Sequence, residues 1–156
     1  MAVLALVATG CTFIGGPSEP PDARSALRVD RLFQDRPTSL RPADVQVGDD
    51  CDSSGDGVYV YWKTEATVAE RDELLSWFSQ RAGTHGWAHH QTLTASDLNL
   101  DETIAPSNYN ETLDPDFLSM EYVKRVDRPE GTWSAHAFYS DHVFVVKLLA
   151  DTECAR

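Results

Sequence analysis

The C-terminal part of the chain holds three consecutive stretches in which apolar and polar residues alternate. They cover residues 118–126, 132–139 and 142–150. An alternation with a period of two is that of a β-strand with one buried face. The segment Asp127–Gly131 and the pair Ser140–Asp141 carry turn residues between these stretches. Because strands joined by short turns pair antiparallel, the pattern predicts two successive hairpins.

The preceding segment predicts a strand, a helix and another strand. The aromatic and β-branched run Val58–Trp62 is typical of a strand. Thr67 and Glu70 have the spacing of a capping box, which opens a helix that ends near Gly86. Residues 87–95 alternate again. We therefore expect an α+β fold, with one main helix packed on a curved antiparallel sheet of about four to five strands.

Two weaker segments flank these elements. Residues 45–47 read as a short strand, and residues 49–57 read as a polar turn. Residues 96–116 form a long acidic excursion rich in Pro and Asn. Loops of that length are uncommon in compact domains and often functional. With 42% hydrophobic residues, the stretch 27–156 is expected to fold as a single globular domain.

The N-terminus reads as an export signal. Residues 1–10 contain no charge and are too short to cross a membrane as a helix. No basic residue follows Met1, so we expect this signal segment to be truncated at its start. Ala8-Thr9-Gly10-Cys11 resembles the lipobox of bacterial lipoproteins. That resemblance implies cleavage before Cys11 and acylation, for example by palmitate, of its thiol. Residues 11–26, rich in Gly, Pro and Ser, would then be the lipid-anchor cysteine and a flexible linker.

The chain has three cysteines. If Cys11 carries lipid, Cys51 and Cys154 remain, and an even pair in an exported protein is normally a disulfide. Two free thiols or a metal pair are the alternatives. A metal pair is disfavoured because no CxxC spacing is present. We therefore expect a disulfide between Cys51 and Cys154.

The charge of the chain excludes some partners. The formal net charge is -12, from 25 acidic and 13 basic residues. Nucleic-acid binding needs Lys and Arg to neutralise phosphates, so we expect no nucleic-acid partner. The acidic surface also disfavours direct adhesion to an anionic membrane. We expect the domain to be held at the outer face of the cell membrane through its lipid, in an extracytoplasmic location.

No motif names a catalytic chemistry. The chain has no Gly-x-Ser-x-Gly elbow for a hydrolytic serine. His89 and His90 are adjacent in a predicted strand, so their rings should point to opposite faces. Asp50–Gly55 resembles the start of a calcium loop, but the twelfth position is Tyr61 where a Glu is required. We therefore expect no cofactor, no metal and no assigned catalytic residue.

The candidate partner surface combines aromatic and acidic side chains. Tyr59 and Tyr61 share one face of a predicted strand, which makes them candidates for exposure. The remaining candidates belong to the long excursion and are Asp97, Asp101, Tyr109 and Asp114.

A second resemblance covers most of the mature chain. Tyr59-Val60-Tyr61, Trp77-Phe78, Gly86-Trp87 and a last strand running into Cys154 are similar to small actinobacterial secreted lipoproteins. This resemblance implies the location and the fold of the chain and not an activity. We expect a non-enzymatic binding or accessory module of the cell envelope, which contacts an envelope protein or a small ligand. The alternative is an envelope hydrolase or metal-dependent enzyme that uses scattered His and Asp residues.

Overall fold

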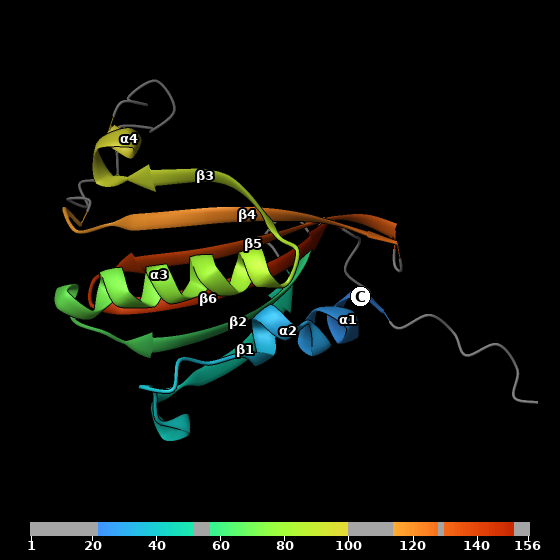
Figure 1. Ribbon diagram of the computed structural model, residues 1–156, viewed down its shortest axis with the longest axis horizontal. Coiled ribbons are helices and arrows are strands. Elements are labelled where there is room, and N and C mark those ends of the chain that lie inside the picture. Colours follow the sequence, from blue (N-terminus) through green and yellow to red (C-terminus); the bar gives the residue numbers. More distant parts are fainter. Residues whose placement is uncertain (1–21, 52–56, 100–113, 128–129, 152–156) are drawn as a thin grey trace, which may run out of the picture.

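The computed structural model describes residues 22–51, 57–99, 114–127 and 130–151. Its strands form one six-stranded sheet in the order β1-β2-β6-β5-β4-β3, and all neighbours are antiparallel (Figure 1). In chain order the strands are β1 (Gln46–Cys51), β2 (Gly57–Glu65), β3 (Ala88–Thr94), β4 (Leu118–Asp127), β5 (Glu130–Ser140) and β6 (Val143–Asp151).

The α+β class is confirmed, but the sheet has six strands instead of four to five. The difference comes from β1, which is longer than the short strand predicted at residues 45–47. It pairs with β2 from Gln46 opposite Lys63 to Cys51 opposite Val58. Sequence reasoning assigned most of this segment to a polar turn, because Gly48 and two aspartates give it no strand pattern. Pairing with β2 supplies the hydrogen bonds that local propensity does not.

The predicted C-terminal hairpins are present as β4, β5 and β6. The turn between β5 and β6 lies one residue later than expected, at Asp141 and His142, because Ser140 pairs with Val143. Both turn residues have positive φ, at 50° and 63°. The last strand, β6, also pairs with β2, so strands that are far apart in the sequence lie side by side.

The main helix α3 (Val68–Thr84) begins at the predicted capping box. The Thr67 side chain accepts a hydrogen bond from the Glu70 amide, and the Glu70 carboxylate accepts one from the Thr67 amide. The pKa of Glu70 is lowered by these Thr67 hydrogen bonds. The buried side chains of α3 face the sheet and are Leu74, Leu75, Phe78 and Ala82.

Two short helices precede the sheet, α1 (Ala23–Val29) and α2 (Arg31–Gln34). Ala23 and Ala26 are buried, so α1 begins inside the stretch that was expected to be linker. Arg24 and Arg28 both form ion pairs with Asp49 of β1. A 3-10 turn, η1 (Pro42–Asp44), leads into β1.

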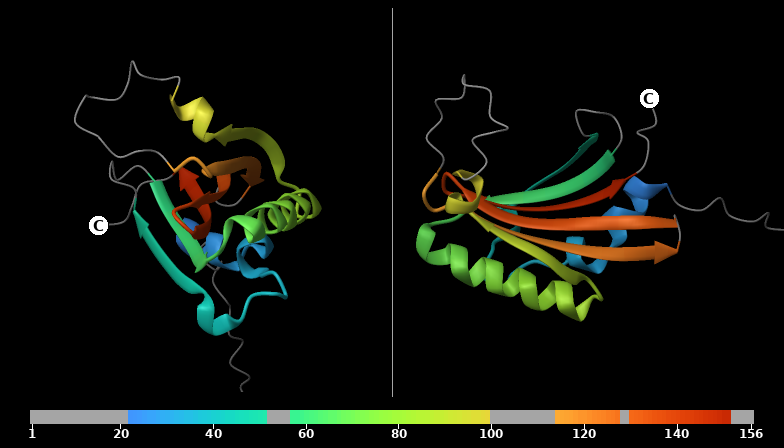
Figure 2. Two further views of the ribbon diagram at one scale, coloured as in Figure 1. Left: turned by 90° about the vertical axis from the view of Figure 1, so that its left-hand side faces the viewer. Right: turned by 90° about the horizontal axis from the view of Figure 1, so that it is seen from above.

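The core lies between these helices and one face of the sheet (Figure 2). In β2, β5 and β6 every second residue is buried, which matches the strand period. The ring of Trp62 is fully buried, 5.7 Å from that of Phe144 and 6.0 Å from that of Trp77. No helix in the described ranges is long and apolar enough to cross a membrane.

Candidate functional site

The helices α1, α2 and α3 all pack on the same face of the sheet, and no described helix covers the opposite face (Figure 2). We call this opposite face the open sheet face. Its side chains alternate with those of the core along each strand and are only partly buried. Those at its centre are Tyr59, Tyr61, Glu121, Val123, Ser134, His136, Phe138, Val145, Lys147 and Leu149.

A row of polar side chains crosses the open sheet face. Strand register places Glu121, His136, Lys147 and Tyr61 side by side on four adjacent strands. Gln91 Nε2 donates a 2.6 Å hydrogen bond to Glu121, which extends the row onto the edge strand β3. The register therefore gives the open sheet face a fixed arrangement of donors, acceptors and charges.

His136 has two polar neighbours in this row. Its Nε2 lies 3.1 Å from Ser134 Oγ and 3.7 Å from Glu121 Oε1. The pKa of His136 is lowered, chiefly because burial disfavours the charged ring; Glu121 opposes this shift and Lys147 adds to it. In a hydrolytic triad the serine and the acid contact opposite ring nitrogens. Here both approach Nε2, so the geometry is not that of a proton relay.

The two tyrosines of the predicted surface lie together on the open sheet face. The ring centroids of Tyr59 and Tyr61 are 6.2 Å apart, and Lys147 Nζ lies 3.8 Å from the Tyr59 centroid. The Tyr61 ring rests on the backbone of Gly48, where a Cβ atom would be 2.5 Å from the ring. Glycine permits this close approach, and a Cβ atom at position 48 would make the Tyr61 ring shift.

The candidates from the long excursion divide into two groups. Asp97, in the short helix α4 (Ala95–Asn99), accepts hydrogen bonds from the Thr94 amide and hydroxyl. Asp114 accepts from the amides of Asp116 and Asp141. The pKa values of both are lowered, primarily by the backbone hydrogen bonds of Thr94 and Asp141, respectively. These two carboxylates support turns. Asp101 and Tyr109 lie outside the described residues.

A second feature is a pocket of about 500 Å³ on the helix side of the sheet. We call it the end pocket, because it lies where α1 and α2 meet the end of α3 and the ends of β4 and β5. Its lining consists of Ala26, Val29, Asp30, Arg31, His85, Lys124, Val126 and Trp133.

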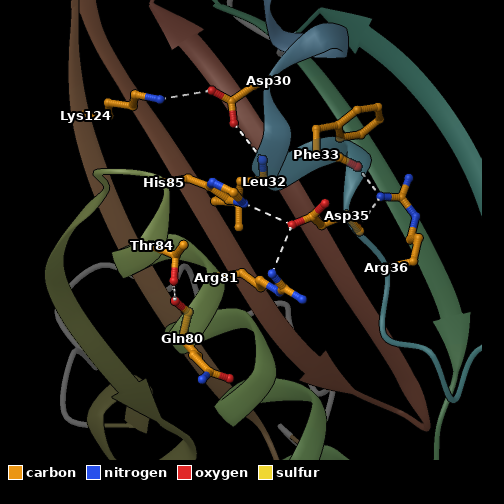
Figure 3. A network of polar contacts seen from close by, with 10 residues as sticks. All are labelled: Asp30, Leu32, Phe33, Asp35, Arg36, Gln80, Arg81, Thr84, His85 and Lys124. Atoms are coloured by element: carbon orange, nitrogen blue, oxygen red, sulfur yellow. Dashed lines mark hydrogen bonds and ion pairs between the residues drawn. The ribbon is translucent and has the colours of Figure 1, made fainter.

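A polar network borders the end pocket (Figure 3). Lys124 Nζ lies 3.2 Å from Asp30 Oδ2, and Asp30 Oδ1 accepts a hydrogen bond from the Leu32 amide. His85 Nε2 lies 2.9 Å from Asp35 Oδ2. Because a carboxylate only accepts, this His85 nitrogen carries the proton. These contacts join the two N-terminal helices to α3 and β4.

Arg36 lies next to Asp35 and Phe33 and belongs to the same network (Figure 3). Its guanidinium lies 4.6 Å from the Trp62 ring centroid and 5.2 Å from that of Phe33. It donates to the backbone carbonyls of Phe33 and Asp35. Burial lowers the pKa of Arg36 to about 10, against the opposing charge of Asp35. The stacking geometry is that of a cation–π contact.

The histidines stand apart. His85 caps α3, His89 and His90 lie in β3, His136 lies in β5 and His142 lies in the β5–β6 turn. Among the residues that the structure describes, no three His, Cys, Asp or Glu side chains are grouped so that they could hold a metal ion. Asp52–Gly55, most of the calcium-like segment, lie outside the described ranges.

Comparison of the chain with known protein families, with curated proteins and with solved structures found no match. The functional assignment therefore depends on the geometry described above.

Proposed function

We propose that this protein is a lipid-anchored binding or accessory module of the cell envelope, and that the open sheet face contacts its partner. The observation that carries the proposal is the surface formed by Tyr59, Tyr61 and the polar row. Tyrosines and partly buried aliphatic side chains supply contact area at low entropic cost, and the register of Glu121, His136 and Lys147 supplies direction.

The composition of the open sheet face favours an extracytoplasmic protein as the partner. Phe138, Val145 and Leu149 lie among polar groups of both charge signs, as in the mixed surfaces of non-obligate interfaces. The alternative of a hydrolase has less support, because Ser134 and Glu121 share one nitrogen of His136. Lipid on Cys11, followed by the linker, would hold this surface beside the membrane. The acidic surface of the domain is itself not attracted to an anionic membrane.

Site-specific photo-crosslinking in intact cells tests the surface. A benzophenone amino acid at Phe138, in the centre of the open sheet face, should form an adduct with a discrete partner. The same amino acid at Gln80, exposed on α3, is the matched control and should form none. The adduct should be lost when Tyr59→Ala and Tyr61→Ala are combined. Equal adducts at Phe138 and Gln80, or none at Phe138, would refute the proposed surface.

The anchor has a separate test. Cys11→Ala, expressed behind an intact export signal, should release the protein from the membrane fraction into the medium or wash. Retention of the variant with the membranes would contradict lipidation at Cys11.

A further inference from the structure

The end pocket has an apolar floor. The indole of Trp133 is only 5% exposed, and Ala26 beside it is 8% exposed. Val29 at the rim is 70% exposed, which is unusual for a large apolar side chain in the described part of this chain. Val29 therefore offers apolar area at the rim, whereas Trp133 lies beneath it with little of its surface exposed.

The rim of the end pocket is cationic, although the chain as a whole is strongly acidic. Its ionisable groups are Asp30, Arg31, His85 and Lys124. The single carboxylate is already engaged, because Asp30 Oδ2 contacts Lys124 and Oδ1 accepts from the Leu32 amide. Among the lining residues, two permanent cations therefore face one carboxylate, while Asp35 lies behind His85, in a chain whose formal net charge is -12.

The position of Lys124 is set by its neighbours. It lies directly opposite Trp133 in the β4–β5 register, and its Nζ is 5.3 Å from the Trp87 ring centroid. The ammonium group is therefore held at the edge of the apolar floor, with its side chain 27% exposed. An anion at this point would gain a charge-assisted hydrogen bond while its apolar part lies against Val29.

We propose that the end pocket binds a small amphipathic organic anion. Its aromatic or branched apolar part lies against Val29, above the buried Trp133, and its carboxylate or sulfonate faces Lys124 and Arg31. The end pocket is open to solvent, so a ligand of roughly two rings would be covered on one side only. This site lies on the helix side of the sheet and does not depend on the proposed function of the open sheet face.

Two dyes with one ring system test the charge requirement on the full chain. The probe 8-anilino-1-naphthalenesulfonate carries the anionic group, and N-phenyl-1-naphthylamine has the same rings without it. In fluorescence titrations the sulfonate should saturate one site per chain, and the neutral dye should bind about tenfold more weakly, since one charge-assisted hydrogen bond is lost. In an amide NMR spectrum the Trp133 indole signal should shift with the sulfonate.

Paired variants at the rim should act in opposite directions. Lys124→Gln should weaken sulfonate binding about tenfold and leave the neutral dye unchanged. Asp30→Asn should strengthen sulfonate binding, because Asn still caps α2 but removes the competing carboxylate. Lys147→Gln on the open sheet face is the matched control and should change neither dye. If the Lys124→Gln variant does not fold, the double variant with Asp30→Asn and Lys124→Gln, which carries no charge at either position, is used in its place.

The proposal is overturned if the native chain does not bind the sulfonate, or if both dyes bind equally well. It is also overturned if Lys147→Gln weakens the sulfonate as much as Lys124→Gln does. An unmoved Trp133 signal at saturation would place the dye elsewhere and refute the site.

Discussion

The Nε2 atom of His85 lies 2.9 Å from Oδ2 of Asp35, and this contact joins the end of α3 to the end of α2 across 50 positions of sequence. Arg81 approaches the same carboxylate oxygen at 3.7 Å. Asp35 therefore has one hydrogen bond from His85 and one longer ion pair with Arg81. Together with the Lys124–Asp30 bridge, this contact attaches the N-terminal helices to the body of the domain.

Replacement of Asp35 by Ala should lower the free energy of unfolding by about 1 kcal/mol, since it removes one hydrogen bond in a partly exposed site. Urea unfolding at pH 7 measures the change. Asp72→Ala is the matched control, because within the described residues Asp72 pairs only with Arg71, and its side chain is 72% exposed. It should change stability by less than about 0.5 kcal/mol. Equal losses in both variants would show that the Asp35 contact contributes nothing specific.

His136 should make stability fall on mild acidification. Its pKa lies below the ordinary value of 6.5 in the folded chain, chiefly because of burial, so the unfolded chain takes up this proton first. The folded state is then disfavoured as pH falls from 6.5 through the folded pKa. His136→Gln should therefore lose less stability between pH 7 and pH 5 than the native chain in urea unfolding. If His136→Gln keeps the native pH slope, burial of His136 is not linked to stability.

The β5–β6 turn is under backbone strain at His142. Its φ of 63°, after 50° at Asp141, is the geometry of a type I′ turn, in which Gly is preferred at the second position. His142→Gly should raise the free energy of unfolding by about 1 kcal/mol and raise the melting temperature accordingly. His142→Ala removes the same imidazole but keeps the Cβ atom, so it should give no gain. A gain from Ala equal to that from Gly would place the effect in the side chain and not in the backbone.

A disulfide between Cys51 and Cys154 stays a prediction, since Cys154 lies outside the described residues. In the described strands Cys51 is opposite Val58, Val58 is opposite Ala150, and β6 ends at Asp151, close in sequence to Cys154. Peptide mapping without reductant should recover the two cysteines linked. Reduction should destabilise the domain by up to about 4.7 kcal/mol, the value for a loop of about 100 residues. Alkylation of both thiols before reduction would contradict the bond.

The sheet was predicted where its pattern is local. Alternation in residues 118–150 predicts β4, β5 and β6, and the Thr67–Glu70 spacing predicts the start of α3. The strand β1 was only partly recognised, because Gly48, Asp49 and Asp50 have low strand propensity. Its pairing depends on β2, and Asp49 is held there by Arg24 and Arg28.

The end pocket was not predicted. Its charged residues Asp30, His85 and Lys124 come from three separate parts of the chain, and no spacing in the sequence relates them. The His85–Asp35 contact has the same character. Such clusters arise only when α1 and α2 dock beside the end of α3. Periodicity in residues 26–33 does not distinguish a helix from a strand.

The sequence by itself determined the fold class, because strand and helix periods and the capping box are local properties of the chain. It also showed that Tyr59 and Tyr61 share a face. Only the tertiary structure decided which face of the sheet the helices cover. In β6 both faces are largely apolar, so periodicity leaves that choice open. Packing of α3 against Trp62, whose ring contacts Trp77 and Phe144, decides it, since these large rings fill the space beneath the helix and leave the tyrosine face open.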